Sequence, residues 1–269
     1  MAAEAYERGR PPYPPDAVEW MVQALRIGPG TTVVDVGAGT GKLTRLLAAL
    51  RVRPVAVDPV PAMLHQLIRT APGVPAVGGR AEALPVQSGC ADAVTVAQAF
   101  HWFAGPVALS EIRRILRPGG GLGLIWNIRD DSVPWVAEMT EIIERHRGDT
   151  PGALLVDWKA SFSPSSGFGP LEHRTFAFGH SLSRDAVLDR VLSISFISTL
   201  PHHARETVRS EVLALLDEDP ATRERNTIVL PYRTDVYVAR SGREESGDAL
   251  HERRDVPEEV PRGGVNDEL

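Results

Sequence analysis

Three glycines at alternate positions interrupt an apolar run near residue 40 and give the chain its clearest chemical motif. The run is Val33-Val34-Asp35-Val36-Gly37-Ala38-Gly39-Thr40-Gly41-Lys42-Leu43. Apolar residues give way to glycine and then return with helical spacing, which predicts a strand, a tight turn and a helix. Glycine allows positive φ and lets a ligand lie against the main chain, while the helix start offers unpaired N–H groups. We therefore expect a nucleotide-like cofactor at this turn.

Two classes of cofactor fit such a turn. Dinucleotide-binding enzymes use G-x-G-x-x-G, whereas this chain has G-x-G-x-G, with Lys42 where the last dinucleotide glycine would fall. The spacing favours a cofactor other than NAD, and a nicotinamide-dependent dehydrogenase stays as an alternative.

A carboxylate, Asp58, ends the next predicted strand, 54–58. In that position it can accept hydrogen bonds from both hydroxyls of a ribose, which suits any adenosine-containing cofactor. The alternative is a surface aspartate that caps the turn toward Pro59 and Pro61.

Strands and helices alternate around these residues. The pattern predicts helices over 15–25, 43–50, 63–68 and 107–117, with strands over 33–36, 54–58, 75–78, 93–98 and 121–126. Strands over 173–178 and 234–239 follow, with helices over 184–197 and 204–216 between them. This order predicts an α/β protein whose parallel sheet carries helices on both faces and binds ligands at the carboxyl ends of the strands.

The chain divides into three predicted regions. Residues 1–30 form an arm and a helix that cover the cofactor, 31–240 form the main domain, and 241–269 form a disordered acidic tail. Lid helices are expected around 130–170 and 181–226, where they would control the choice of substrate.

Composition disfavours several function classes. The chain has 269 residues and a formal net charge of −6, most of which comes from the tail, so the body offers no basic face for nucleic acid. The single cysteine, Cys90, cannot form an intrachain disulfide and has no motif partner as a nucleophile. No signal peptide or membrane-length apolar run is present, so we expect a cytoplasmic protein without membrane insertion. The pair His202-His203 lacks further ligands at metal spacing, so no metal site is expected.

Six motifs, in this order, resemble class I methyltransferases that use S-adenosylmethionine. They are Arg10–Pro14, Asp35–Gly41, Asp58, Gly79–Pro85, Ala99–Phe103 and Leu116–Gly120. Over about residues 5–240 the chain is most similar to the small-molecule branch that includes trans-aconitate and quinone-biosynthesis methyltransferases. The resemblance implies a Rossmann-like, doubly wound sheet of seven strands with the last antiparallel and helical lid insertions. It also implies methyl transfer from S-adenosylmethionine to a small-molecule acceptor, at oxygen or carboxylate first and carbon second.

The same resemblance implies a set of cofactor-binding residues. They are Asp35, Gly37, Ala38, Gly39 and Gly41 at the turn around the methionine part, Asp58 at the ribose, Ala81 and Glu82 at the adenine edge, Gln98 beside the sulfonium, and Tyr13 closing over the cofactor. Arg80 stands where the family has an acidic residue before the alanine. An arginine cannot accept a hydrogen bond from the adenine amino group, so we assign that role to Glu82 or to backbone.

Candidate acceptor-side residues lie near the ends of the fourth and fifth strands. His101 is the candidate catalytic base, required only if the acceptor must lose a proton; alternatively it hydrogen-bonds locally and orients Trp102. Trp102 packs against the sulfonium or an apolar acceptor, or belongs to the core. Trp126 and Arg129 are further candidates, Arg129 either holding an acidic acceptor or lying solvated in a loop. A catalytically inactive cofactor-binding regulator or partner protein stays open as an alternative function, and so does the oligomeric state.

Overall fold

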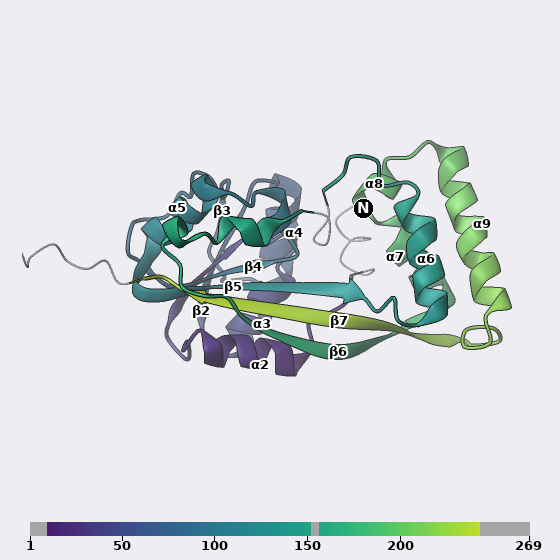
Figure 1. The fold of residues 1–269 in the computed structure, drawn as a ribbon, viewed down its shortest axis with the longest axis horizontal. Helices are drawn as coiled ribbons and strands as arrows, with labels where there is room; N and C mark the ends of the chain where they lie inside the picture. Colours follow the sequence, from purple (N-terminus) through teal and green to yellow (C-terminus); the bar gives the residue numbers. More distant parts are fainter. Residues whose placement is uncertain (1–9, 152–155, 243–269) are drawn as a thin grey trace, which may run out of the picture.

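A computed structural model of the chain describes residues 10–151 and 156–242, which form a seven-stranded sheet in the order β3-β2-β1-β4-β5-β7-β6 (Figure 1). The strands are β1 (Thr32–Val36), β2 (Arg53–Asp58), β3 (Ala76–Gly78), β4 (Ala91–Ala97), β5 (Leu116–Arg129), β6 (Glu172–Ser183) and β7 (Thr227–Arg240). Strands β1 to β5 pair in parallel, and β7 runs antiparallel to both β5 and β6. The predicted α/β fold with an antiparallel last strand is confirmed.

Helices cover both faces of this sheet because alternate residues of its strands are apolar on opposite sides. Val33 and Ala93 pack with α2 (Pro15–Ala24) and α3 (Lys42–Ala49), whereas Val34 packs on the other face with α5 (Pro106–Ile115). Helix α4 (Pro61–Thr70) packs through Leu67 on Ala56 of β2. Each of α2, α4 and α5 begins with proline, whose fixed φ suits a first helical turn and whose missing N–H costs no hydrogen bond there.

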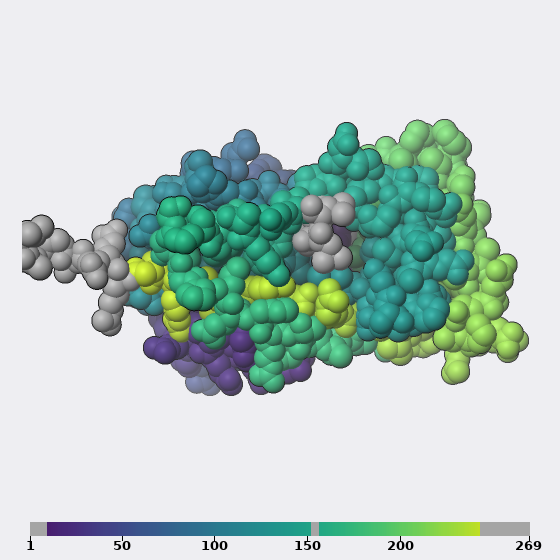
Figure 2. Space-filling model, in the orientation of Figure 1, coloured from purple at the N-terminus to yellow at the C-terminus, as the bar shows by residue number. Residues whose placement is uncertain are grey.

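A second hydrophobic core lies beyond the carboxyl end of β5. It contains α6 (Pro134–Glu144), α7 (Arg184–Leu192), α8 (Ser195–Ser198) and α9 (His202–Glu218), which we call the helical lobe. Figures 1 and 2 show these helices gathered at one end of the molecule. Pairing of β6 with β7 continues to Ser183 and Thr227, past the last β5–β7 pair of Arg129 with Tyr232. The lobe packs on this extension through Leu182, Ile228 and Leu230.

Several predicted boundaries were wrong, and tertiary pairing explains most of them. Strands β5, β6 and β7 are longer than predicted because antiparallel pairing carries them beyond their periodic segments. The helix predicted over 184–197 is two helices, separated at Ser193, whose hydroxyl donates to the Arg190 carbonyl at 3.0 Å. Such side-chain bonding to backbone competes with helix continuation.

The expected covering segments divide between the two cores. From 130–170, α6 joins the helical lobe, but Trp158 and Phe168 pack in the main core around α5. Helix α2 packs on the sheet and on α3, and its predicted role in covering the cofactor stays a prediction. The tail predicted to be disordered lies outside the described residues except for its first two. None of the described helices is long and apolar enough to span a membrane.

Candidate active site

The glycine turn between β1 and α3 needs its glycines for two different reasons. Gly37, Gly39 and Gly41 all have positive φ, of 69°, 57° and 84°. A Cβ on Gly37 would lie 2.8 Å from Ala99 Cβ, and one on Gly41 would lie 2.8 Å from Leu67 Cγ. A Cβ on Gly39 would meet nothing within 4 Å. Gly37 and Gly41 therefore allow close packing, while Gly39 faces open space.

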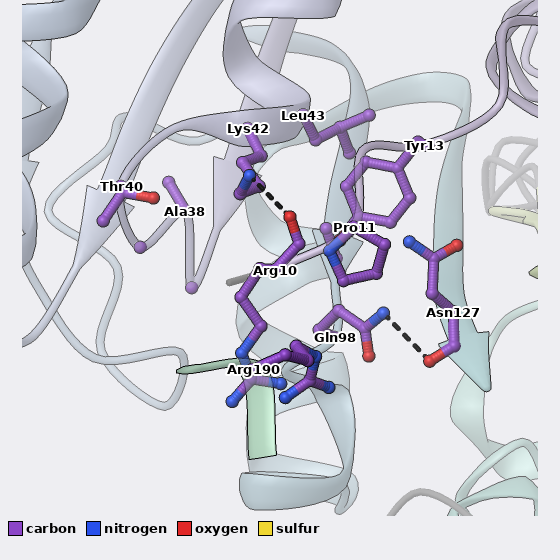
Figure 3. A pocket seen from close by; sticks show the side chains of 13 residues that line it. Arg10, Pro11, Tyr13, Ala38, Thr40, Lys42, Leu43, Gln98, Asn127 and Arg190 are labelled. Carbon is purple, nitrogen blue, oxygen red and sulfur yellow. Dashed lines mark hydrogen bonds between the residues drawn. The ribbon is translucent and has the colours of Figure 1, made fainter. Parts of the chain in front are cut away.

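That open space is a cavity, which we call the turn cavity (Figure 3). Its lining comes from the N-terminal arm, the turn, the ends of β4 and β5, and α7: Arg10, Pro11, Tyr13, Gly37, Ala38, Gly39, Thr40, Lys42, Leu43, Ala97, Gln98, Asn127 and Arg190. Lys42 Nζ donates to the Arg10 carbonyl at 2.9 Å, and Asn127 Nδ2 donates to the Pro12 carbonyl at 3.0 Å. These two bonds hold the arm against the cavity.

Asp58 fixes the far side of the turn from the end of β2. Its Oδ2 accepts the N–H of Gly39 at 2.8 Å, and its Oδ1 accepts the N–H of Val60 at 2.8 Å. Each carboxylate oxygen can accept a second hydrogen bond, so both retain capacity for a ligand hydroxyl. The cap toward the following proline turn and the predicted ribose contact are therefore compatible at the same side chain.

Asp35 supports the turn from behind and does not line the turn cavity. It is fully buried and accepts hydrogen bonds from Thr44 Oγ1 at 2.6 Å and Thr95 Oγ1 at 3.0 Å. Burial raises the pKa of Asp35 to about 6, and the two threonine donors limit the rise. The side chain bridges β1, α3 and β4 beneath the turn.

The predicted adenine-edge residues stand away from both described cavities. Ala81 is buried, and the Glu82 carboxylate lies on the surface 3.8 Å from Arg80. Neither residue lines the turn cavity or the larger cavity beside it. Their roles therefore stay predictions.

A larger cavity of about 480 Å³ lies between the sheet edge and the helical lobe, and we call it the lobe cavity. Arg10, Gln98, Asn127 and Arg190 line both cavities, so the two adjoin each other. The remaining lining comes from the turn after β4, from β5 and from the lobe, and includes His101, Trp102, Arg129, Ile143, Arg147, Phe196 and Tyr232.

Gln98 carries backbone strain at the junction of the two cavities. Its φ is +59°, a left-handed conformation that is uncommon outside glycine. Its N–H donates to the Ile125 carbonyl at 2.9 Å, and its Nε2 donates to the Asn127 carbonyl at 3.3 Å. These bonds to β5 hold the strained residue in place.

His101 lies in the short turn Phe100–Trp102 and faces the lobe cavity. Its Nδ1 accepts the indole N–H of Trp126 in a long hydrogen bond of 3.4 Å. Because indole nitrogen only donates, this bond requires the neutral ring to carry its proton on Nε2. Burial, helped by the Arg147 charge, lowers the pKa of His101 to about 4. The arrangement favours a locally held hydrogen-bond donor over a catalytic base.

The three other acceptor-side candidates have different surroundings. Trp102 is 54% exposed and lines the lobe cavity, so its interpretation as a core residue was wrong. Trp126 is 2% exposed, stacks on Trp158 at 4.8 Å between ring centroids and lines neither cavity. The sequence made Trp126 a candidate substrate-binding residue; in the structure it belongs to the main core and contacts the lobe-cavity residue His101 through its indole N–H.

Arg129 ends β5 rather than lying solvated in a loop. Its Nε donates to Thr140 Oγ1 at 2.9 Å, and its Nη2 lies 3.7 Å from the Glu144 carboxylate. Burial and the neighbouring Arg190 charge lower the pKa of Arg129. The side chain is thus already engaged with α6 at the wall of the lobe cavity.

Arg190 and Tyr232 are among the cavity residues that the sequence analysis missed. Arg190 falls three residues after Val187 on the apolar face of α7, and a charge at such a position is the signal that could have identified it. Tyr232 lies in the early part of β7 that periodicity did not predict.

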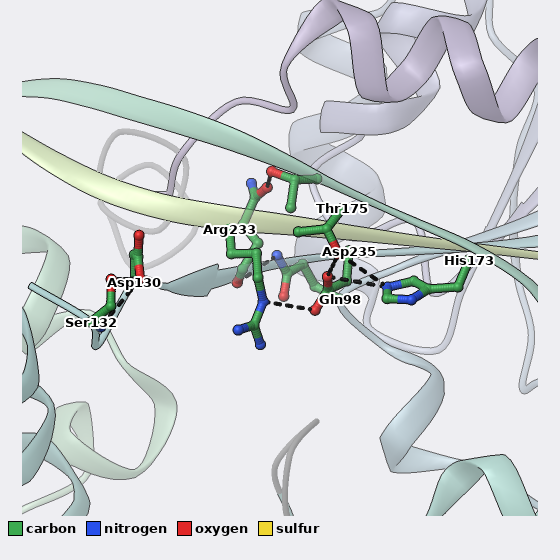
Figure 4. Close-up of polar contacts among 9 residues, drawn as sticks. Gln98, Asp130, Ser132, His173, Thr175, Arg233 and Asp235 are labelled. Carbon is green, nitrogen blue, oxygen red and sulfur yellow. Dashed lines mark hydrogen bonds and ion pairs between the residues drawn. The ribbon is translucent and has the colours of Figure 1, made fainter.

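A polar cluster on β6 and β7 has a structural role (Figure 4). Asp235 accepts hydrogen bonds from Thr175 at 2.7 Å and Arg233 at 3.2 Å, and lies 3.2 Å from His173 Nε2. None of these residues lines either cavity. Within residues 10–151 and 156–242, no group of histidine, cysteine and acidic side chains could hold a metal ion.

Comparison with known proteins gives consistent relatives. A family profile described as a methyltransferase domain matches residues 34–124. An uncharacterized methyltransferase of Mycobacterium tuberculosis is 40% identical over 233 residues, 87% of this chain and 91% of the relative. An uncharacterized methyltransferase-like protein of Schizosaccharomyces pombe is 38% identical over 231 residues, 85% of this chain and 90% of the relative. A solved structure from Anaeromyxobacter dehalogenans, named as a type II methyltransferase, has a TM-score of 0.63 at 22% identity and covers 87% of this chain and 97% of its own, which shows a shared fold.

Proposed function

Because the chain belongs to the methyltransferase family, we propose that it transfers a methyl group from S-adenosylmethionine to a small organic acceptor. The observation that carries the proposal is the pairing of two adjoining cavities, one at the glycine turn and one under the helical lobe. Family membership also sets aside the nicotinamide-dependent dehydrogenase that the glycine spacing left open.

S-adenosylmethionine is the methyl donor, and the turn cavity has features that fit it. Gly39 leaves space where any side chain would project. The Asp58 carboxylate lines neither cavity, but it accepts the Gly39 N–H at the edge of the turn cavity and retains acceptor capacity. Gly37 to Gly41 would hold the methionine part, Asp58 the ribose, Gln98 the region of the sulfonium, and Tyr13 on the arm would cover it. When bound, the cofactor supplies a methyl carbon activated by a positively charged sulfur.

The lobe cavity supports a small acceptor rather than a polymer. Its volume of about 480 Å³ is in the usual range for small-molecule sites, and the helical lobe encloses it on one side. Trp102, Ile143 and Phe196 supply apolar surface, while His101 and the arginines supply donors. The helical lobe would therefore act as the lid that selects the acceptor.

Within this site the protein's own task is alignment and exclusion of water. Neutral His101 is too weak a base to remove a proton from an alcohol, but its Nε2 proton can be donated to an acceptor oxygen. An acceptor oxygen that is already anionic needs no base. This supports oxygen and carboxylate acceptors ahead of carbon.

Isothermal titration of the full chain tests the cofactor assignment. S-adenosylmethionine and S-adenosylhomocysteine should bind, and NAD and NADP should not. Asp58→Ala should weaken binding at least about tenfold, because a ribose hydroxyl loses its charged acceptor. Asp185→Ala, an exposed change on α7, is the matched control and should bind normally. Binding of NAD in preference, or of neither cofactor, would refute the proposal.

A further inference from the structure

Arg190 is a buried cation at the junction of the two cavities, and within residues 10–151 and 156–242 it has no ion-pair partner. The residue is 7% exposed, and its Nε and Nη1 atoms are shielded from water and have no hydrogen-bond partner in the described part of the chain. Figure 3 shows its guanidinium reaching the turn cavity from α7, opposite the glycine turn. Burying a charge without a partner is costly, so such groups are normally paired.

The surroundings of Arg190 do not supply the missing negative charge. Three arginines from β5, α7 and the segment after α6, Arg129, Arg190 and Arg147, line the lobe cavity, against the two carboxylates of Asp131 and Glu144. Glu144 is committed to ion pairs with Arg147 and Arg129, and Asp131 accepts the Thr140 hydroxyl at 2.8 Å. The cavity therefore keeps an excess of positive charge.

A second unpaired donor faces the same cavity. The hydroxyl of Tyr232 is buried, accepts from or donates to none of the residues that the structure describes, and belongs to a residue that lines the lobe cavity. Tyr232 lies directly opposite Arg129 in the β5–β7 pairing, and Arg190 is close enough to Arg129 for its charge to lower the pKa of Arg129, so all three lie around one region of the cavity wall. Buried polar groups in native proteins are almost always hydrogen-bonded, so two orphans at one cavity indicate a ligand that completes them.

We propose that Arg190 binds a carboxylate group of the methyl acceptor, with the Tyr232 hydroxyl donating to the same ligand. This inference rests on the proposed function and specifies its substrate class. A guanidinium presents a planar fork of donors that matches the two oxygens of a carboxylate. Apolar Ile143 and Phe196 on the same lining would pack against the carbon skeleton of such an acid.

The methionine carboxylate of the cofactor is a second possible source of the same chemistry, because Arg190 also lines the turn cavity. The two sources are separable with 5′-methylthioadenosine, which keeps the adenosine and thioether but lacks the amino-acid carboxylate. A variant that has lost a contact to the cofactor carboxylate would bind S-adenosylhomocysteine poorly and 5′-methylthioadenosine normally.

The test is calorimetry on the full chain after it has been saturated with S-adenosylhomocysteine. The titrants are the anions glutarate, benzoate and inorganic phosphate, and the neutral counterparts glutaramide and benzamide. The variants are Arg190→Gln, Arg190→Lys and the control Arg145→Gln. Arg145 is an exposed lobe arginine paired with Glu211 at 2.9 Å, so its loss changes net charge equally without touching either cavity.

We expect at least one carboxylate to bind the wild type and its neutral amide to fail. Arg190→Gln should weaken the carboxylate at least about tenfold, Arg190→Lys should be intermediate, and Arg145→Gln should match the wild type. S-adenosylhomocysteine should bind all four proteins within about twofold. The melting temperature of Arg190→Gln should be no lower than that of the wild type, because no partner is lost.

Three results would overturn the inference. They are selective loss of S-adenosylhomocysteine but not 5′-methylthioadenosine binding in Arg190→Gln, binding of phosphate alone, and no anion binding at all. If the wild type binds no S-adenosylhomocysteine, the proposed function fails instead. The carboxylate titrations without cofactor then still decide whether Arg190 forms an anion site.

Discussion

The indole N–H of Trp126 on β5 points at Nδ1 of His101, 3.4 Å away in the turn that follows β4. This contact joins the aromatic part of the main core to the wall of the lobe cavity, since Trp126 also stacks on Trp158. It sets the neutral tautomer of His101 and leaves Nε2 as a donor. A site that offers donors and excess positive charge is suited to an acceptor that arrives as an anion.

The first prediction concerns the protonation of His101. Its pKa in the folded protein is about 4, below the ordinary 6.5, so its contribution to stability is present above pH 6.5 and is lost as the pH falls toward 4. His101→Asn cannot titrate. The stability difference between wild type and this variant, from urea unfolding, should therefore shrink between pH 7 and pH 5.

Two-dimensional NMR of the ring carbons provides the independent check. The His101 resonance should keep its neutral position down to about pH 5, in the tautomer protonated on Nε2. A His101 resonance that titrates at its ordinary value would contradict the assigned neutral state.

Local patterns were sufficient to predict the cofactor half of the fold. The glycine turn and the strand ending at Asp58 depend on residues close together in the sequence, and the types of those residues indicate the local backbone conformation. Seven strands and the antiparallel partner followed from the order of motifs and their family resemblance. These parts are confirmed in the sheet topology.

The helical lobe and the lobe cavity could not be predicted in the same way. Arg190 reaches the cavities only because β6 and β7 extend past β5 and carry the helical lobe over the strand ends. Trp126 and Arg129 are close in sequence, yet one lies in the main core and the other at the cavity wall. Which of the two side chains lies at a cavity depends on where the pairing of β5 with β7 ends, and hydrophobic periodicity in the sequence does not reveal that end point.

Asp35 should reduce stability at neutral pH. Its folded-state pKa of about 6 exceeds the ordinary 3.8, so its protonated form is favoured by folding and stability is lost as the pH rises from about 4 to 6. Asp35→Asn cannot ionise and can still bond Thr44 and Thr95. It should be more stable than the wild type by up to about 3 kcal/mol at pH 7, with the gain absent below pH 4.

Urea unfolding across this pH range measures the gain. Asp35→Ala is the matched comparison, because it also removes the charge but leaves the two buried threonine hydroxyls without their acceptor. It should be less stable than Asp35→Asn at every pH. An Asp35→Asn gain that does not depend on pH would show that ionisation of this carboxyl is not the cause.

Gly39→Ala should separate ligand binding from folding. Gly39 has φ of 57° and nothing within 4 Å of its Cβ position, and Gly30, far from the cavities, has φ of 81° and equally open space. Alanine at either position should cost about 1–2 kcal/mol of stability. Only Gly39→Ala places a methyl group in the turn cavity, so only it should weaken S-adenosylhomocysteine binding, by at least about tenfold.

Calorimetry and urea unfolding of both variants provide this comparison. Gly37→Ala is a useful third variant, since its Cβ would lie 2.8 Å from Ala99 Cβ and it should destabilise the fold more than either. Equal loss of cofactor binding in Gly30→Ala and Gly39→Ala would mean that strain, and not occupation of the cavity, is responsible.

The strained backbone of Gln98 should contribute to ligand binding and not to the stability of the fold. Its φ of +59° is matched by Glu224, also at +59°, in an exposed loop beyond α9. Glycine at either position removes the left-handed strain and should stabilise the protein by about 1 kcal/mol. At position 98 part of this gain is offset, because the 3.3 Å hydrogen bond from Nε2 to the Asn127 carbonyl is lost.

The two glycine variants should then diverge in binding. Gln98→Gly removes a side chain that lines both cavities and should weaken S-adenosylhomocysteine, whereas Glu224→Gly should bind like the wild type. Asparagine tolerates positive φ and keeps an amide on a side chain one methylene shorter. Gln98→Asn therefore separates the contribution of the side-chain amide from that of the backbone conformation. If Gln98→Gly, Gln98→Asn and Glu224→Gly all bind S-adenosylhomocysteine equally well, the strained backbone at position 98 is unrelated to cofactor binding.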